Sequence, residues 1–204
     1  VDLAGLPKDR FYLYRSHWNK EVETLHILPH WNWEGREGEV TPVYCYTNYP
    51  TAELFVNGKS QGVKKNVDGK DKNKLKWDNI KYAPGYIEAV AKRDGKIVAR
   101  HRIETTGKVK KLVAESDNAN WQADGMDLQH VRIYAVDSKG RRVHSAENQL
   151  KFRVEGDAEI VAVDNGNIVS HELHAVKERK LYRGSALVIL RAGQSPSDIK
   201  LIAE

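Results

Sequence analysis

The sequence predicts an all-β protein made of two immunoglobulin-like β-sandwich domains in tandem, preceded by one short helix. Residues 148–155 alternate cleanly, with Leu150, Phe152 and Val154 on one face and polar side chains on the other, as in a half-buried antiparallel strand. Similar runs recur along the chain with turn signals between them, and short strands at this spacing favour β-sandwiches. Only one segment has a helical pattern.

The helix is expected near the N-terminus, over residues 8–18, with Pro7 suited to its first turn. Its apolar side chains wrap around more than one face: Phe11, Tyr12, Leu13, Tyr14 and Trp18. A helix that is apolar on several sides is usually buried, and an isolated helix of this length is marginal in water. It therefore needs a partner, which is either the first sandwich or a domain outside this sequence.

Strands are expected throughout the remainder of the chain. Dipeptides that favour tight turns separate them, among them Asn57-Gly58, Asp94-Gly95 and Asn165-Gly166. The predicted strands cover residues 40–47, 52–56, 86–93, 96–104, 111–115, 131–137, 148–155, 159–163, 186–191 and 198–202.

A polar stretch at residues 105–108 interrupts the run of strands, and we place a domain boundary there. This gives an N-terminal segment at residues 1–20, a first sandwich at residues 21–106 and a second at residues 107–204. Each of the two larger parts has about the size of one immunoglobulin-like sandwich.

The amino-acid composition argues against a membrane-spanning protein and against a nucleic-acid-binding protein. The 204 residues are 40% hydrophobic and 30% charged, as in an ordinary globular protein, and no apolar run approaches the roughly 20 residues of a spanning helix, so no membrane insertion is expected. The net charge of +5 raises the question of nucleic acid, but the 33 basic residues are spread over the whole chain. The densest lysine clusters, at residues 64–65, 70–76 and 108–111, are mixed with Asp and Asn or lie near turns, and no nucleic-acid-binding motif accompanies them, so we interpret them as solvated surface. The only methionine is Met126, which indicates a piece of a longer protein.

Residues that could carry chemistry are few. The lone Cys45 lies in a strand-like run and is expected to be a buried, inert thiol. The pair His171 and His174 lacks the spacing and the further ligands of a metal site, and residues 164–167 lack the ligand pattern of a calcium loop. No pair of carboxylates stands out for glycoside cleavage, and no phosphate-binding or nucleophile motif is present. We therefore expect no catalytic residue, no metal and no cofactor in this chain.

The aromatic residues leave two alternatives open. Trp31 and Trp33 lie close to His30 in the segment ILPHWNW, and Trp121 lies near a turn. Flat aromatic faces stack on sugar rings, but large rings also fill protein cores. These residues are therefore either contacts to a ligand or partner domain, or packing.

Five ordered motifs resemble the C-terminal region of glycoside hydrolase family 2 enzymes, and in particular the β-galactosidases of gut Bacteroides-type bacteria. The motifs are LPKDRFYLY at 6–14, LHILPHWNW at 25–33, ELFVNGKS at 53–60, ADG at 123–125 and VDNGN at 163–167. The resemblance implies that a catalytic (β/α)8 barrel precedes these residues and that residues 1–18 are its tail, last helix included. The family's two catalytic glutamates lie upstream, so no residue here corresponds to either.

The resemblance thus implies two non-catalytic accessory domains of a retaining β-galactosidase, which support the barrel, substrate access or oligomerisation. The alternative is a carbohydrate-binding module that tethers the enzyme to polysaccharide. His30, Trp31, Trp33 and Trp121 are the expected contacts to sugar or to the barrel of the same polypeptide. A periplasmic or secreted location is suggested by the resemblance alone.

Overall fold

The computed structural model describes all residues, 1–204, and divides the chain into two compact units. The first unit is Pro7–Thr106, and the second unit combines Val1–Leu6 with Gly107–Glu204. The division falls after Thr106, within the polar stretch noted in the sequence. Residues 1–20 are expected from the sequence to form one segment, whereas in the structure residues 1–6 belong to the second unit and residues 7–20 to the first.

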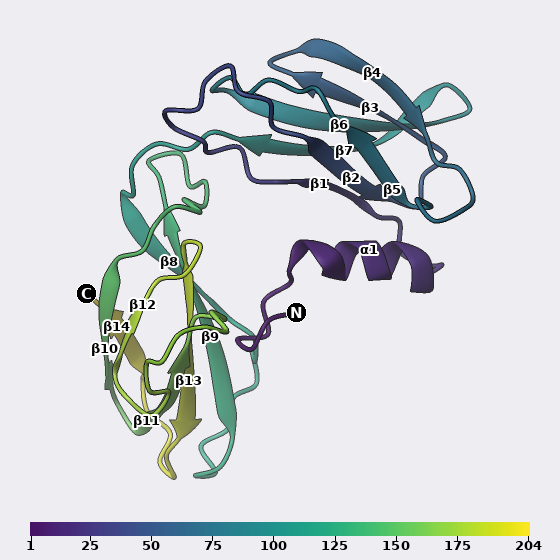
Figure 1. Ribbon diagram of the computed structural model, residues 1–204. Helices are drawn as coiled ribbons and strands as arrows, with labels where there is room; N and C mark the ends of the chain where they lie inside the picture. Colours follow the sequence, from purple (N-terminus) through teal and green to yellow (C-terminus); the bar gives the residue numbers. More distant parts are fainter. The chain divides into compact units, whose positions relative to one another are not determined.

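The first unit has one helix and two antiparallel sheets, with strand orders β1-β2-β5 and β4-β3-β6-β7 (Figure 1). Its elements are α1 (Asp9–Trp18), β1 (Leu25–Leu28), β2 (Val43–Thr47), β3 (Thr51–Val56), β4 (Lys59–Lys65), β5 (Lys74–Trp77), β6 (Tyr86–Arg93) and β7 (Lys96–Glu104).

The two sheets of the first unit pack face to face around one core. Alternation decides which side chains enter it: on β5, Leu75 and Trp77 are buried while Lys74 and Lys76 point outward. Both sheets contribute to the same cluster, which contains Ile27, Val43, Cys45, Leu75 and Trp77 from one sheet and Ala52, Leu54, Ile87 and Ala89 from the other. Burial raises the pKa of the Cys45 thiol to about 12.

Two hairpins of the first unit follow directly from their turn residues. Asn57 and Gly58 have φ of 48° and 83° between β3 and β4, and Asp94 and Gly95 have φ of 51° and 77° between β6 and β7. Two consecutive positive φ angles define the turn whose twist matches a tight hairpin, and Asn-Gly and Asp-Gly are the pairs that tolerate them.

α1 packs on the outer face of sheet β1-β2-β5 (Figure 1). The ring of Tyr12 stacks on His26 with centroids 3.8 Å apart, and the carboxylate of Asp9 accepts a hydrogen bond from His26 Nε2 at 2.8 Å. Arg15 Nε donates to Thr24 Oγ1 at 3.0 Å. The first sandwich is therefore the partner of one face of the helix.

The opposite face of α1 is exposed to solvent. Tyr14 and Trp18 stack on each other with centroids 4.8 Å apart, and they are 45% and 76% exposed. Ser16 is the one buried residue of the helix, and its carbonyl accepts a hydrogen bond from the amide of buried Asn73 at 2.8 Å. Polar contacts thus hold a helix whose aromatic stack faces solvent.

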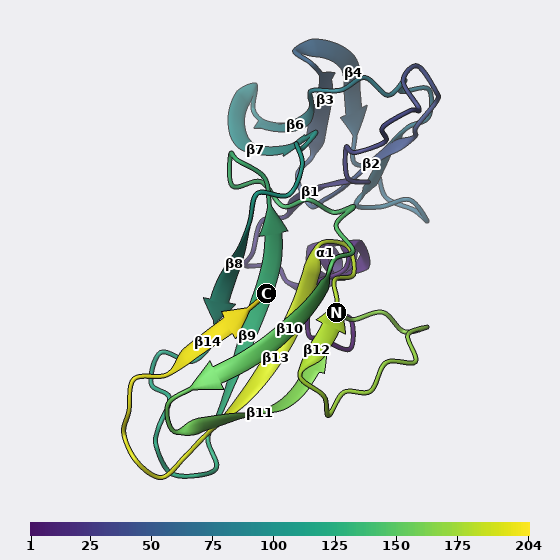
Figure 2. The same ribbon diagram turned by 90° about the vertical axis from the view of Figure 1, so that its left-hand side faces the viewer.

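The second unit is also a two-layer antiparallel sandwich, with strand orders β12-β10-β14 and β11-β13-β9-β8. Its strands are β8 (Lys111–Ser116), β9 (Leu128–Val136), β10 (Gln149–Glu155), β11 (Ala158–Asp164), β12 (Glu178–Lys180), β13 (Ser185–Ala192) and β14 (Lys200–Ala203). The inner faces share a core to which Leu150 and Phe152 contribute from one sheet and Ile133, Val163 and Val188 from the other. The long connection between β11 and β12 extends away from the sheets (Figure 2).

Residues 1–6 cover part of the outer face of the larger sheet of the second unit. Ala4 and Leu6 are buried against Leu187, with Tyr134 beside them. The segment closes on itself, because Leu6 N donates to Asp2 Oδ1 at 2.8 Å and Asp2 N donates to the Leu6 carbonyl at 2.9 Å.

The predicted all-β fold with two sandwiches and one short helix is confirmed, and each predicted strand overlaps an observed one. Four short strands were not predicted: β1, β4, β5 and β12. The helix α1 has 10 residues, which is too short to span a bilayer.

We expect the first unit to lose stability when the pH falls from about 7 to about 5, because of His101 on β7. His101 Nδ1 accepts a hydrogen bond from Ile27 N at 2.9 Å and so joins the two sheets as a neutral ring. Burial, with a smaller effect of the neighbouring His26, lowers the pKa of His101 to about 4. An unfolded histidine has a pKa of about 6.5, so in this window the unfolded state binds more protons and the free energy of unfolding falls by about 1–2 kcal/mol.

Urea unfolding followed by tryptophan fluorescence measures this loss, since four of the five tryptophans lie in the first unit. His101→Gln removes the titrating group, so the variant is expected to lose less stability over the same pH interval. An equal loss in both proteins would contradict the assignment.

Candidate functional site

The segment ILPHWNW leads out of β1, which ends at Leu28, immediately before the cis peptide bond between Leu28 and Pro29. Proline has no N–H for a sheet ladder, which fits the end of pairing at this point. The following residues run without regular structure to β2, and the aromatic residues of the segment lie at the beginning of that run.

Trp31 is part of the core. Its side chain is 0% exposed, its Nε1 donates to the carbonyl of Ala83 at 2.9 Å, and its ring meets Tyr82 edge to face with centroids 5.1 Å apart. A tryptophan with no exposed surface and a satisfied N–H offers no platform to a sugar. The structure therefore places Trp31 with packing residues.

Trp33 and His30 form a partly buried stack at the surface. Their ring centroids are 4.3 Å apart, and the guanidinium carbon of Arg36 lies 5.1 Å from the centroid of the Trp33 ring. The indole Nε1 of Trp33 is buried and has no hydrogen-bond partner. The contacts of Trp33 with its own neighbours thus occupy part of the aromatic surface that a ligand would need.

Residues 31–32 of this segment bind the C-terminal end of the first unit through hydrogen bonds. The side-chain oxygen of Asn32 accepts hydrogen bonds from Thr106 N at 2.8 Å and from Thr106 Oγ1 at 3.3 Å. Thr105 Oγ1 donates to the carbonyl of Trp31 at 2.7 Å. Residues 31–32 and 105–106, which are 74 positions apart, are joined by these three hydrogen bonds.

Trp121 lies in the second unit, away from these residues in the sequence. It is partly buried, packs against the core of that unit, and donates from Nε1 to the carbonyl of Asp127 at 2.9 Å. The four aromatic residues singled out in the sequence therefore include one close surface pair, His30 and Trp33, and two tryptophans with packing contacts.

Of the histidine pair His171 and His174, His174 belongs to a polar network in the connection between β11 and β12. His174 Nδ1 lies 3.0 Å from Asp164 Oδ2, and the buried Arg179 donates to the carbonyl of Val163 at 2.8 Å. Arg179 also lies 3.4 Å from a carboxylate oxygen of Glu172. No group of three or more His, Cys, Asp or Glu side chains is placed to hold a metal ion.

The carboxyl groups show no sign of acid catalysis. Those whose pKa departs clearly from the ordinary value are all shifted down, whereas a general acid at neutral pH needs a raised pKa. The strongest case is Asp137, where hydrogen bonds from the Arg141 side chain, and then from the backbone N–H groups of Gly107, Arg141 and Lys139, hold the pKa well below its usual range. Asp137 is a structural anchor.

The first unit has two hollows that were not predicted from the sequence. One, of about 370 Å³, is polar and includes Glu23, Asn73 and Arg93 in its lining. The other, of about 570 Å³, lies along β4 and β5 and is lined mainly by lysines. The signal was present in the dense lysines of residues 64–76, which were interpreted as solvated surface.

Part of each unit matches a known domain family. Residues 112–204 match the glycoside hydrolase family 2 C-terminal domain 5, and residues 38–99 match a domain of unknown function, DUF4982.

The chain is 41% identical over 206 residues to the β-galactosidase BoGH2A of Bacteroides ovatus, a match that covers 100% of this chain and 23% of that protein. It is also 30% identical over 210 residues to a putative β-glucuronidase of Formosa agariphila, a match that covers 99% of this chain and 20% of that protein. The chain thus spans less than a quarter of the length of these two relatives.

Solved structures agree with the sequence matches. A glycosyl hydrolase family 2 member from Bacteroides cellulosilyticus superimposes with a TM-score of 0.92 at 35% identity, over 100% of this chain and 30% of that one. A β-glycosidase from Bacteroides vulgatus gives a TM-score of 0.92 at 31% identity, over 100% of this chain and 26% of that one.

Asn32→Ala is expected to lower the free energy of unfolding of the first unit by about 1–2 kcal/mol, because Thr106 N loses its partly buried acceptor. Urea unfolding followed by tryptophan fluorescence measures the change. Asn79→Ala is the matched control, since Asn79 is an exposed residue of the same unit. Equal stabilities of the two variants would show that the Asn32 contacts carry no net stabilisation.

Proposed function

Since the chain belongs to the C-terminal region of glycoside hydrolase family 2, we propose that it is a non-catalytic accessory part of such an enzyme and supports the catalytic barrel of the same polypeptide. The observation that carries this proposal is the exposed Tyr14–Trp18 stack on α1. The helix is held to the first sandwich by its other face, so the aromatic face is free to pack on a neighbouring domain. Large exposed aromatic side chains in a contiguous pair are a common mark of an interaction surface.

The polar contacts beneath α1 strengthen this argument. Arg15 and the carbonyl of Ser16 bind residues of the first sandwich, which fixes the helix without using its aromatic pair. A helix held in this way presents Tyr14 and Trp18 in a defined position at little conformational cost. Buttressing of the barrel by the helix is the favoured accessory role, and support of substrate access or of a homo-oligomer would use the same exposed surface.

For the intact enzyme we favour the hydrolysis of terminal β-galactosides. Support comes from the relative with 41% identity, which is a β-galactosidase, whereas the relatives described as β-glucuronidases are 30–35% identical. Both reactions cleave a terminal β-linked sugar, and the choice between them depends on pocket contacts in the catalytic part. The reaction would proceed there, and this fits the carboxyl groups of this chain whose pKa is clearly shifted, since all of these are shifted down and a general acid needs a raised pKa.

A carbohydrate-binding module based on tryptophan has less support. Trp31 is fully buried, Trp121 packs on the core of the second unit, and Trp33 is already in contact with His30 and Arg36. A saturable change in fluorescence on titration with galactose or lactose that is lost in Trp121→Ala would restore this alternative.

The accessory role predicts that Tyr14→Ser combined with Trp18→Ser destabilises the intact enzyme more than the isolated chain. In the isolated 204-residue chain both side chains are already exposed, so the free energy of unfolding should change by less than about 0.5 kcal/mol. In the intact enzyme, loss of two buried aromatic contacts should cost about 2–4 kcal/mol. Thermal unfolding of both forms measures the difference.

Met126→Ser is the matched control, because Met126 is 79% exposed and lies in the second unit. It is expected to have a small effect in both forms. A small effect of the Tyr14 and Trp18 substitutions in the intact enzyme would refute the role of α1 as a buttress.

The substrate assignment predicts a higher kcat/KM of the intact enzyme for an aryl β-galactoside than for the corresponding β-glucuronide. The isolated chain should hydrolyse neither. A preference for the glucuronide would overturn the assignment to β-galactosides, and turnover by the isolated chain that survives repurification would overturn its non-catalytic role.

A further inference from the structure

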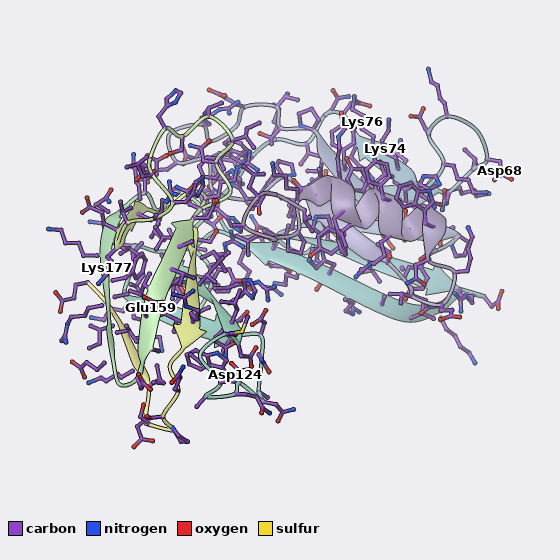
Figure 3. The ribbon with its side chains drawn as sticks, turned by 90° about the horizontal axis from the view of Figure 1, so that it is seen from below. Asp68, Lys74, Lys76, Asp124, Glu159 and Lys177 are labelled. Carbon is purple, nitrogen blue, oxygen red and sulfur yellow. The ribbon has the colours of Figure 1, made fainter.

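A lysine groove lies on the first unit, where the edge strands of its two sheets come together. We use this name for the hollow of about 570 Å³ lined by Tyr44, Lys64, Lys65, Lys70, Asp71, Lys74, Leu75 and Lys76. β4 is the edge of one sheet and β5 the edge of the other, and both strands contribute lysines. Figure 3 shows Lys74 and Lys76 next to each other, with Asp68 on the neighbouring loop.

Positive charge dominates the groove. Its lining holds five lysines against one aspartate, and Lys64, Lys65 and Lys70 form no ion pair. Lys74 Nζ lies 2.8 Å from Asp71 Oδ1, and Lys76 pairs with Asp78 outside the lining. A hollow lined by one sign of charge focuses the field and raises the local concentration of counter-ions.

Protection of sheet edges explains only part of this arrangement. Lysines on an edge strand prevent pairing with other chains, and this suits Lys64 and Lys65 on β4. Lys70 is not on a strand, however, and the lysines converge on one hollow from β4, β5 and the loop between them. Like charges placed together destabilise the folded state, so their convergence indicates an anionic ligand.

An aromatic ring lies among these charges. Tyr44 on β2 is opposite Lys76 on β5, and the Lys76 ammonium lies 5.5 Å from the centroid of the Tyr44 ring. The helix α1 covers part of the outer face of sheet β1-β2-β5 by packing against β1 and β2. Tyr44, Lys74 and Lys76 line the hollow, which the helix leaves open. Because the Lys76 ammonium already contacts the Tyr44 ring, the groove offers a ligand mainly charge and only one aromatic side chain.

We propose that the lysine groove binds an acidic oligosaccharide whose carboxylate or sulfate groups pair with Lys64, Lys65 and Lys70. The choice of a saccharide rests on the family assignment, while the groove and its charge do not. Single-stranded nucleic acid would be expected to use several stacking aromatic residues, and the groove holds only Tyr44. The ligand would tether the enzyme to an acidic polysaccharide without use of the tryptophans.

Isothermal titration calorimetry of the 204-residue chain tests the proposal with three probes of matched length: an oligogalacturonate, a dextran sulfate oligosaccharide and neutral dextran. Saturable binding of at least one acidic probe is expected, weakening as salt is added, with none for neutral dextran. The acidic probe that binds more tightly distinguishes carboxylate from sulfate. Binding of neither acidic probe, or tighter binding of an oligothymidylate of equal charge, would overturn the proposal.

Two double variants with the same change in charge locate the site. Lys64→Glu with Lys70→Glu should weaken binding by about tenfold or more, while Lys108→Glu with Lys110→Glu, on exposed lysines of the second unit, should leave it within about twofold. Equal weakening by both would mean attraction by net charge alone and would overturn the site. Lys64→Gln with Lys70→Gln replaces the first variant if it fails to fold.

This experiment is independent of the buttressing role of α1. It measures binding by the isolated chain, so the groove can fail while the Tyr14 and Trp18 substitutions still destabilise the intact enzyme. Conversely, the groove can bind an acidic probe while the Tyr14 and Trp18 substitutions leave the stability of the intact enzyme unchanged.

Discussion

The burial of Trp31 is the interaction on which the arrangement of the first unit depends. The side chain fills the core beside Tyr82, and its satisfied N–H removes the cost of burying a polar atom. Because the ring is fixed, the backbone that carries it is fixed as well, and Thr105 and Thr106 bind to that backbone and to Asn32. One aromatic side chain thus sets both the exit from β1 and the end of the unit.

Alternation and turn chemistry made most of the fold predictable. β3, β6, β7, β9, β10 and β13 have apolar side chains at every second position or in continuous runs, and Asn57-Gly58 and Asp94-Gly95 adopt the backbone angles that their sequence favours. β4 and β5 were missed because edge strands carry lysines, which in a sequence look like a solvated loop. The omission also hid the lysine groove, since its walls are these two strands.

The candidate site was less predictable for a different physical reason. Trp31 and Trp33 are two positions apart and chemically identical, yet one is fully buried and the other is partly exposed beside His30. The difference depends on residues 82–83 and 105–106, which are distant in sequence, so spacing alone could not supply it. The partner of α1 was left open for the same reason, because the polar contacts of Arg15 and Ser16 with Thr24 and Asn73 depend on tertiary structure.

The packing of residues 1–6 on the second unit has a consequence for the topology of the chain. The second unit is built from two pieces, and the whole first unit, with its helix, is an insertion between them. Residues 107–204 alone would leave the apolar surface at Leu187 and Tyr134 uncovered. During synthesis the ribosome releases Ala4 and Leu6 long before β13 exists, so completion of the second sandwich waits for a contact that spans almost the entire sequence.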